Sequence, residues 1–532
     1  MRTKCWRASA GTRAERLCCA WNEDGSSAHS RQLESDGGRL LFTRAPDGAW
    51  LWAMELDDDF DRIGPRVLEW IARDRRTLPE RPVFQPYPPE LAARLAQSAW
   101  PEAGQDAEAV LDAFEREVGP YPFGNGHPRF YGWVNSPPDP IGVLGDALAS
   151  AMNPSCAGGN HAAVHVERAV VRWLAVALGF PPNAGGLLVS GGSMAALTAL
   201  AVARHARSGV DVREEGLHGG PRLRVYRSGE GHGCYQKAVE MLGLGRRSLH
   251  AVPTDAALRM VPEALAAAID EDVARGERPM AVVATAGTVN TGAIDPLEAI
   301  ADVCAARGVW LHIDGAYGAP AALTDEHRAV LSAIARADSV AIDPHKWLYV
   351  PVECGLVLVK EAAAMRDTFS LVPPYLRTEG QDDGAAAGGV SAGPWLSEYG
   401  FQQTRGFRAL KLWMAMKRRG QAGYRAAIAH DIAVARHLAD TLRARPTELE
   451  VWEPQGLSIV CFRCAPAALR GNEAALDTLN RRVVERVQLG GEAFLSSTVL
   501  GGKVYLRACV VNPRATHADV EALVTAVVEA AR

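Results

Sequence analysis

The chain has 532 residues, too many for one small domain, so two or three structural units are expected. Its 48% apolar and 22% charged residues are ordinary for a globular protein with a large core. The net charge of −5 leaves no basic surface field, which argues against nucleic acid or an anionic membrane as the main partner. No apolar stretch is long enough to cross a bilayer, and residues 1–20 lack the apolar region of a signal peptide. A cytoplasmic protein is therefore expected.

The ten cysteines are scattered along the chain and do not form a regular disulfide framework, which fits reduced thiols in a cytoplasm. Cys461 and Cys464 form a CxxC pair. A zinc site would need a second pair of ligands, and none stands nearby in the sequence. The pair is therefore interpreted as two core cysteines, and no metal is expected.

Residues 1–53 are rich in Arg, Ser and Gly and show little apolar periodicity, so we expect a disordered or non-native extension. An amphipathic targeting segment is the alternative. The pattern changes at Met54, where acidic residues come first. Apolar residues then recur at helical spacing, at Ile63, Val67, Leu68 and Ile71. A second helical pattern follows at 90–118, and we assign residues 54–139 to an N-terminal helical segment.

Residues 140–408 alternate between helical patterns and short β-rich runs. Helices are expected at 164–180 and 297–306. The expected strands are 186–190, 222–226, 280–285, 309–314 and 339–343. Such alternation is typical of a mostly parallel sheet with helices on both faces, so this region is predicted to be a large α/β domain.

Residues 409–532 have a different pattern. A long helix is expected from residue 409 onward, followed by an alternation of strands and helices. The expected strands are 449–452, 457–463 and 504–511, and the expected helices are 472–487 and 516–532. This pattern predicts a smaller α+β domain at the C-terminus.

Lys346 is the first candidate for a catalytic side chain. It follows the expected strand 339–343 and so lies at the strand's carboxyl end, where open α/β sheets bind ligands. A lysine between His345 and Trp347 is expected to have a lowered pKa, as a Schiff-base nucleophile requires. A lysine at a strand end is by itself more often an ordinary surface residue, so the assignment depends on other residues.

Asp314 ends another apolar strand, where burying a carboxylate is costly unless a cation meets it. A protonated pyridine nitrogen is such a cation. The turn Ser190-Gly-Gly-Ser193 joins a strand to a helix and suits a phosphate at the helix N-terminus. No Gly-Lys-Ser/Thr follows this turn, so it does not have the sequence of a P-loop. His232, between two glycines, is weak evidence when taken alone.

In combination and in this order, the motifs resemble the group II amino-acid decarboxylases that depend on pyridoxal 5′-phosphate (PLP). That family includes aromatic-L-amino-acid, histidine and glutamate decarboxylases. The resemblance extends from about Met54 to the C-terminus. The matching motifs are His127-Pro-Arg-Phe130, the Gly-Gly-Ser turn, Gly231-His232, Ala284-Thr-Ala-Gly-Thr288, His312-Ile-Asp-Gly-Ala-Tyr317, Pro344-His-Lys-Trp347 and Gly406-Phe-Arg-Ala-Leu-Lys-Leu-Trp413. The resemblance implies the fold type I, aspartate aminotransferase-like architecture of PLP-dependent transferases.

The resemblance also implies roles for individual residues. Lys346 would hold PLP as a Schiff base, and Asp314 would pair with the pyridine nitrogen. His232 would stack on one face of the ring, and Ala316 would pack on the other. Further residues implied are Gly192, Ser193 and His345 at the phosphate, Thr288 in the cofactor pocket, and Trp133, Asn135 and Ser136 at the substrate. A homodimer is implied as well, with the helices of 54–139 wrapped on the partner.

The implied reaction is decarboxylation of an L-amino acid, with aromatic substrates favoured and acidic or diamino substrates left open. Tyr375 precedes a Gly-rich passage where family decarboxylases carry a proton-delivering Tyr on a mobile loop, and aldehyde-forming relatives tend to have Phe. An aldehyde synthase, an aminotransferase or a catalytically idle binding protein on the same scaffold are the alternatives. One departure is Asp343, where the family has Asn, a change expected to be tolerated.

Overall fold

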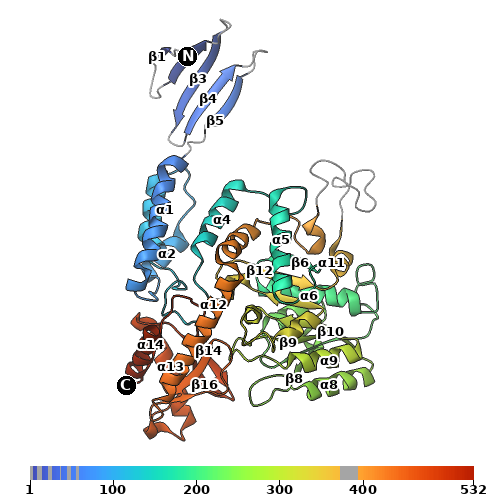
Figure 1. Ribbon diagram of the computed structural model, residues 1–532. Helices are drawn as coiled ribbons and strands as arrows, with labels where there is room; N and C mark the ends of the chain where they lie inside the picture. The colour runs from blue at the N-terminus through green and yellow to red at the C-terminus, as the bar shows by residue number, and fades with distance from the viewer. Residues whose placement is uncertain are drawn as a thin grey trace. The chain divides into compact units, whose positions relative to one another are not determined.

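The computed structural model describes residues 59–371 and 394–532 with their side chains, and within residues 1–58 only the backbone of five strands. The chain forms two compact units, Met1–Phe123 and Gly124–Arg532. In the first unit five strands pair antiparallel in chain order (Figure 1). They are β1 (Lys4–Ala8), β2 (Glu15–Trp21), β3 (Ser27–Ser35), β4 (Gly38–Arg44) and β5 (Trp50–Glu55). The sequence suggested no regular structure here, and whether these residues belong to the native protein stays a prediction.

Three helices follow in the first unit: α1 (Phe60–Thr77), α2 (Pro89–Gln97) and α3 (Ala107–Glu117). The single helical pattern expected at 90–118 is therefore two helices, because the stretch between them contains Pro101 and Gly104. Asp106 begins α3 as its N-cap and accepts a hydrogen bond from the backbone N–H of Glu108. Arg66 of α1 forms ion pairs with acidic residues of α3, which joins the two helices.

The second unit contains a seven-stranded sheet in the order β6-β12-β11-β10-β9-β7-β8. Its strands are β6 (Gly185–Val189), β7 (Leu223–Ser228), β8 (Leu249–Val252), β9 (Arg278–Thr285), β10 (Trp310–Asp314), β11 (Ser339–Ile342) and β12 (Gly355–Val359). Only β12 runs antiparallel to its neighbours. The predicted mostly parallel sheet is therefore confirmed, although β8 and β12 were not predicted.

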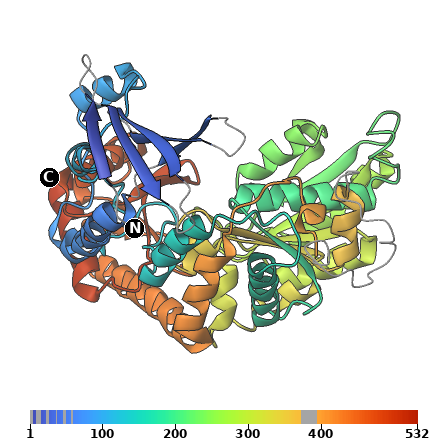
Figure 2. The same cartoon turned by 90° about the horizontal axis from the view of Figure 1, so that it is seen from above.

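Successive residues of the central strands point to opposite faces of the sheet, and each face has its own apolar core. In β10, for example, Trp310 packs on one face and Leu311 on the other. The first face is covered by α6 (Gly192–Arg207), α7 (Cys234–Met241) and α11 (Ala362–Phe369), and the second by α5 (Ala162–Ala177), α8 (Pro262–Ala274) and α9 (Leu297–Arg307). The long helix α12 (Ala409–Arg443) packs on α5 and contributes to the same core as the second face. Figure 2 shows helices on both sides of this sheet. Two further helices are α4 (Pro140–Met152) and the short α10 (Pro344–Trp347).

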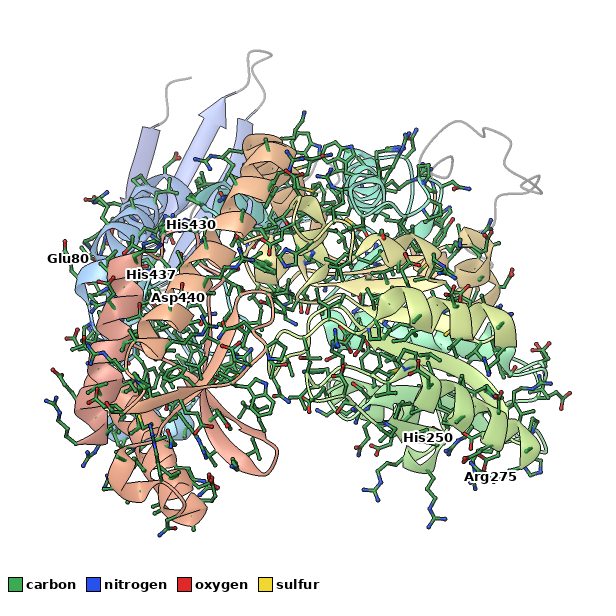
Figure 3. The ribbon with its side chains drawn as sticks, turned by 60° about the horizontal axis from the view of Figure 1, so that its bottom comes forward. Glu80, His250, Arg275, His430, His437 and Asp440 are labelled. Atoms are coloured by element: carbon green, nitrogen blue, oxygen red, sulfur yellow. The ribbon has the colours of Figure 1, made fainter. Side chains whose placement is uncertain are left out.

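The C-terminal part of the second unit has a separate antiparallel sheet and core. The strand order is β13-β14-β16-β15, and helices α13 and α14 pack against it. The bounds are β13 (Leu449–Val451), β14 (Ile459–Cys464), α13 (Glu473–Gly490), β15 (Ser496–Leu500), β16 (Lys503–Cys509) and α14 (His517–Ala531). His430 of α12 is hydrogen-bonded to the carbonyl oxygen of Ala515, just before α14, and His437 of α12 to the carboxylate of Glu521 in α14. Figure 3 labels both histidines along α12.

Several sequence-based expectations can be compared with this architecture. α12 begins at Ala409, where the C-terminal domain was expected to begin, whereas the expected boundary at 139 falls inside the second unit. Cys461 and Cys464 are both buried and form no disulfide, and they pack into different cores on the two faces of β14. Among residues 59–371 and 394–532, no helix combines the length and apolar character needed to span a membrane.

Candidate active site

A cavity of about 420 Å³ lies at the carboxyl ends of the parallel strands. Loops after β6, β7, β10 and β11 supply its walls, so residues far apart in sequence converge there. Seven of the predicted site residues line it: Gly192, Ser193, His232, Asp314, Ala316, His345 and Lys346. The walls also contain residues to which the sequence assigned no role, notably Cys234, Asp343 and Glu353.

The turn after β6 brings backbone close to the cavity at the start of α6. A Cβ atom on Gly192 would lie 2.9 Å from Asp343 Oδ2 and 3.3 Å from Ala316 Cβ, so only glycine fits there without a shift. Ser193 stands in the first turn of the sixteen-residue helix α6, with its N-terminus directed at the cavity. Such a helix N-terminus attracts an anion.

Lys346 forms an ion pair with Asp343, with 2.9 Å between Nζ and Oδ2. Burial lowers the pKa of Lys346, but the charge and hydrogen bond of Asp343, and then the charge of Asp314, outweigh it, so the pKa is raised. The expectation of a lowered pKa from the neighbours His345 and Trp347 was therefore wrong. The Trp347 side chain is fully buried and donates from Nε1 to Asp431 of α12, which leaves Asp343 as the direct partner of Lys346.

Asp314 ends β10 and is only 7% exposed. Its Oδ1 accepts a hydrogen bond from the backbone N–H of Ala316 at 3.2 Å. Burial raises the pKa of Asp314, while the charge of Lys346 and the Ala316 N–H oppose the rise. A buried carboxylate of this kind is well placed to meet a cationic group in the cavity.

Two histidines face the cavity in defined orientations. His232 Nδ1 accepts from the backbone N–H of Cys234 at 3.1 Å, so the proton of the neutral ring is on Nε2. His345 Nδ1 lies 2.7 Å from the carbonyl oxygen of Cys354, and Ser136 donates to the His345 carbonyl at 3.0 Å. Burial lowers the pKa of both rings, so both are suited to act as neutral groups at physiological pH.

The remaining predicted residues lie around this cavity or outside the described residues. Thr288 is fully buried in the loop after β9, where its hydroxyl lies 3.1 Å from that of Thr291, and it does not line the cavity. Trp133 has a left-handed backbone (φ 46°), and its carbonyl accepts from Arg507 at 3.0 Å. Asn135 is half-buried between Trp133 and Ser136. Tyr375 lies outside the described residues.

The principal residue that the sequence interpretation missed is Asp343. It was noted only as a departure from a family motif, yet its carboxylate forms an ion pair with Lys346 and lies close to the backbone of Gly192. A local signal existed, because Asp343 is the N-cap of α10 and an i, i+3 pair on one turn brings two side chains together. Its Oδ1 has no hydrogen-bond partner within the described residues.

These residues fit PLP in charge and in shape. A lysine amine, a buried carboxylate and a helix N-terminus border one cavity. The amine would suit the aldehyde of the cofactor, the carboxylate its pyridine nitrogen, and the helix N-terminus its phosphate. Because residue 192 is a glycine, no Cβ atom crowds Asp343 and Ala316 at the start of α6. Among the described residues no cluster of side chains suits a metal ion.

Comparison with known proteins agrees with this geometry. The pyridoxal-dependent decarboxylase conserved domain matches residues 89–465. An aromatic-L-amino-acid decarboxylase of Bacillus atrophaeus is 35% identical over 461 residues, 86% of this chain and 92% of that protein. An acidic amino acid decarboxylase of Homo sapiens is 31% identical over 446 residues, 82% of this chain and 84% of that protein.

Similarity also extends to the three-dimensional structure. The crystal structure of Oryza sativa TDC with PLP and tryptamine matches 89% of this chain and 98% of that chain, with a TM-score of 0.81 and 27% identity. The expected fold type I architecture is thereby confirmed. With a family domain over most of its length and a cavity whose charges match the cofactor, the chain belongs to the PLP-dependent amino-acid decarboxylases.

Proposed function

We propose that this decarboxylase acts on an aromatic L-amino acid and releases the corresponding amine and carbon dioxide. The observation that carries the proposal is the similarity to the aromatic-L-amino-acid decarboxylase of Bacillus atrophaeus, which extends over 92% of that protein. The acidic amino acid decarboxylase of Homo sapiens is less similar, at 31% identity. An acidic substrate is therefore the second candidate.

The stretch that precedes α4 supports an aromatic substrate. Trp133 is 44% exposed, and its ring centroid lies 5.6 Å from that of Phe494. The stretch is held at Trp133 by Arg507 and at Ser136 by the hydrogen bond to His345, a residue of the cavity wall. A fixed aromatic ring near the cavity suits contact with a second ring, which prefers edge or offset packing.

Each proposed catalytic step uses a named side chain. When bound, PLP supplies a conjugated pyridine ring that takes up the electron pair left when carbon dioxide departs. Lys346 would hold the cofactor through its side-chain amine. Asp314 would meet the ring nitrogen with its buried carboxylate, and His232 and Ala316 would contact the cofactor ring. Tyr375 donates the proton that replaces the carboxyl group on the α-carbon, so no oxidant is consumed.

The other predicted site residues are proposed to bind rather than to react. Gly192, Ser193 and His345 would hold the phosphate. Trp133, Asn135 and Ser136 would contact the substrate. These roles agree with the positive end of α6 and with the link from Ser136 to His345.

We also propose that the enzyme is a cytoplasmic homodimer. The first unit exposes large apolar side chains, including Leu68 of α1, Val110 of α3 and Trp100 between α2 and α3, and such side chains are commonly covered in an assembly. The seven cysteines within the described residues are all free and buried, which suits a reducing compartment. Light scattering and cell fractionation test these two proposals.

The substrate is tested by incubating the purified holoenzyme with tryptophan, tyrosine, phenylalanine, 3,4-dihydroxyphenylalanine, glutamate, aspartate and 2,4-diaminobutyrate. Carbon dioxide, amine, ammonia and keto acid are quantified together. We expect equal amounts of carbon dioxide and amine, with kcat/KM at least about tenfold higher for an aromatic amino acid, since one well-packed ring contributes on that order. A preference for glutamate or aspartate would overturn the aromatic assignment.

The same measurement separates the alternative reactions. Ammonia and an aldehyde alongside carbon dioxide would indicate an aldehyde synthase, and a keto acid without carbon dioxide an aminotransferase. A protein that binds no PLP would be the idle relative. Lys346→Ala serves as the control, because turnover that survives this change cannot come from the proposed site.

A further inference from the structure

A row of buried polar side chains lies behind Asp314, outside the cavity walls. Trp310, His312 and Asp314 are spaced two residues apart in β10, so they point to the same face of the sheet, the one covered by α6 and α7. Tyr235 reaches this row from α7, and Ser339 reaches it from β11. His312 and Ser339 are fully buried and Tyr235 is 1% exposed, so water does not separate them.

Hydrogen bonds connect four side chains of the row, from Trp310 through Ser339 and His312 to Tyr235. Trp310 Nε1 donates to Ser339 Oγ at 2.8 Å. Ser339 Oγ lies 2.9 Å from His312 Nδ1, and His312 Nε2 lies 3.0 Å from the Tyr235 hydroxyl oxygen. Asp314 is the next residue on this face of β10, and its charge acts on the Tyr235 hydroxyl. The row therefore ends at the carboxylate that faces the cavity.

The direction of these bonds follows from the protons available. Burial lowers the pKa of His312 to about 3, so the ring is neutral, with one nitrogen donating and the other accepting. The Trp310 N–H occupies one lone pair of Ser339 Oγ, and the Ser339 proton then has His312 Nδ1 as its acceptor in the row. The opposite direction would leave this buried proton without an acceptor in the row.

His312 consequently donates from Nε2 to the oxygen of Tyr235. Since that bond uses a lone pair of the oxygen, the Tyr235 proton remains available for another acceptor, and Asp314 is the carboxylate whose charge acts most strongly on this hydroxyl. Burial, followed by the charge of Asp314, raises the pKa of Tyr235 well above its usual value, so the hydroxyl keeps its proton at physiological pH.

We propose that Tyr235, oriented by His312 and Ser339, is a positioning residue that donates a hydrogen bond to Asp314 and keeps this carboxylate ionised for the cofactor nitrogen. The inference rests on the role proposed above for Asp314. A hydrogen bond to a carboxylate favours its charged form, whereas burial favours the protonated form. Without the Tyr235 hydroxyl, Asp314 would hold a proton up to a higher pH and would attract a protonated pyridine nitrogen less.

Other titratable groups also face Asp314. Asp343 and Lys346 approach from the start of α10, His232 from the connection between β7 and α7, and Cys234 from the start of α7. All four remain in place in the variants below. Their titration therefore affects the dissociation constant of PLP in wild type and variants alike. This shared effect cancels in the ratio of the two dissociation constants at each pH.

The test is the dissociation constant of PLP from the apoprotein, measured by fluorescence titration between pH 5.5 and 9 for wild type and Tyr235→Phe. A donor to a charged carboxylate lowers its pKa by about one unit or more. The ratio of the variant's dissociation constant to that of wild type should therefore be near one at the alkaline end of the range and rise to about tenfold as the pH falls. The sign follows because the variant loses the ionised form of Asp314 at a higher pH.

Ser339→Ala is a second variant, remote from the cavity. It removes the donor to His312 Nδ1, so the proton of the neutral ring can move to Nδ1. Nε2 can then accept from the Tyr235 hydroxyl, which would no longer donate to Asp314. A smaller pH-dependent loss of affinity in the same direction is expected. Thermal unfolding of both apoproteins reports any loss of packing, and a packing defect alone would lower affinity equally at every pH.

Tyr226→Phe is the matched control. Tyr226 is also fully buried, but it donates to Asp272 at 2.8 Å on the other face of the sheet. His250 and Arg275, labelled in Figure 3, lie beside that carboxylate. The affinity ratio of wild type to this variant should stay near one across the pH range.

Asp314→Asn separates the possible failures. If this variant binds PLP as tightly as wild type, the role proposed for Asp314 is wrong. If it binds weakly while Tyr235→Phe and Ser339→Ala show a ratio that does not change with pH, Asp314 keeps its role and the contribution of Tyr235 is refuted. Should Tyr235→Phe fail to fold, Ser339→Ala decides between the same two outcomes.

Discussion

Replacing Asp343 by Asn should make Lys346 react faster with PLP. The carboxylate lies 2.9 Å from Lys346 Nζ and is the main reason why the pKa of Lys346 is raised in spite of burial. Asn still accepts a hydrogen bond from the amine but carries no charge. Only a neutral amine attacks an aldehyde, so the variant increases the reactive fraction of Lys346.

The size of the effect follows from the pair. The Coulomb energy of two charges at this distance is about 6 kcal/mol at an effective dielectric constant of 20, which sets an upper limit. A hydrogen bond to a charged group contributes about 1.5–3 kcal/mol, equivalent to about one to two pKa units. At pH 7 the neutral fraction of Lys346, and with it the rate of cofactor capture, should rise about ten- to hundredfold.

Stopped-flow absorbance of apoprotein mixed with PLP measures this rate directly. Asp146→Asn is the matched control, because Asp146 pairs with Lys411 at 3.1 Å but does not line the cavity. The control should react at the wild-type rate. A rate for Asp343→Asn equal to or below that of wild type between pH 6.5 and 9 would refute the reasoning. The apoprotein of Asp343→Asn should also have a lower free energy of unfolding than wild type below about pH 10, where the lysine is charged in the unfolded chain. This difference in stability should shrink as the pH rises through the raised pKa of Lys346.

Two further predictions concern buried acids behind the site. Burial raises the pKa of Asp431 to about 8. Between about pH 4 and 8 the folded protein therefore holds a proton on Asp431 that the unfolded chain has lost. Over this range the free energy of unfolding falls by about 1.4 kcal/mol for each unit by which the pH rises. Asp431→Asn should flatten the fall in Tm of the apoprotein between pH 5 and 8, and an unchanged fall would contradict the assignment. Arg405 and Glu167 form an ion pair with 0% and 1% exposure, so Arg405→Ala leaves a buried charge and should cost about 3–5 kcal/mol in urea unfolding. A loss below about 1 kcal/mol would show that water or another cation replaces the arginine.

Local pattern was sufficient for the elements that bear the cofactor residues. β10 and β11 are short apolar runs that end in Asp314 and in the turn to Lys346, and an alternating α/β pattern places such ends along one edge of a sheet. β12 was missed because Gly355–Val359 is five residues long and apolar throughout, and such a run carries no periodicity. Its antiparallel direction depends on pairing with β6, which lies far away in the sequence.

Long-range contacts explain the errors within the site. The lowered pKa expected for Lys346 was based on its chain neighbours His345 and Trp347. Trp347, however, donates a hydrogen bond to Asp431, 84 residues away, and Asp343 forms the ion pair with the lysine. Tyr235 and His312 are 77 residues apart, and no spacing along the chain indicates that they meet. Asp343 was within reach of local reasoning, since a residue at i−3 on a helical turn lies on the same side as the lysine.

The central claim is that Lys346 binds PLP covalently in this decarboxylase. Borohydride reduction of the holoenzyme, followed by proteolysis and mass spectrometry, tests it most directly because the reduced linkage is permanent. We predict that the pyridoxyl group is found on the peptide containing Lys346 and that the reduced enzyme releases no carbon dioxide from any amino acid. A label on another lysine, or an unlabelled Lys346 in an active enzyme, would contradict the account.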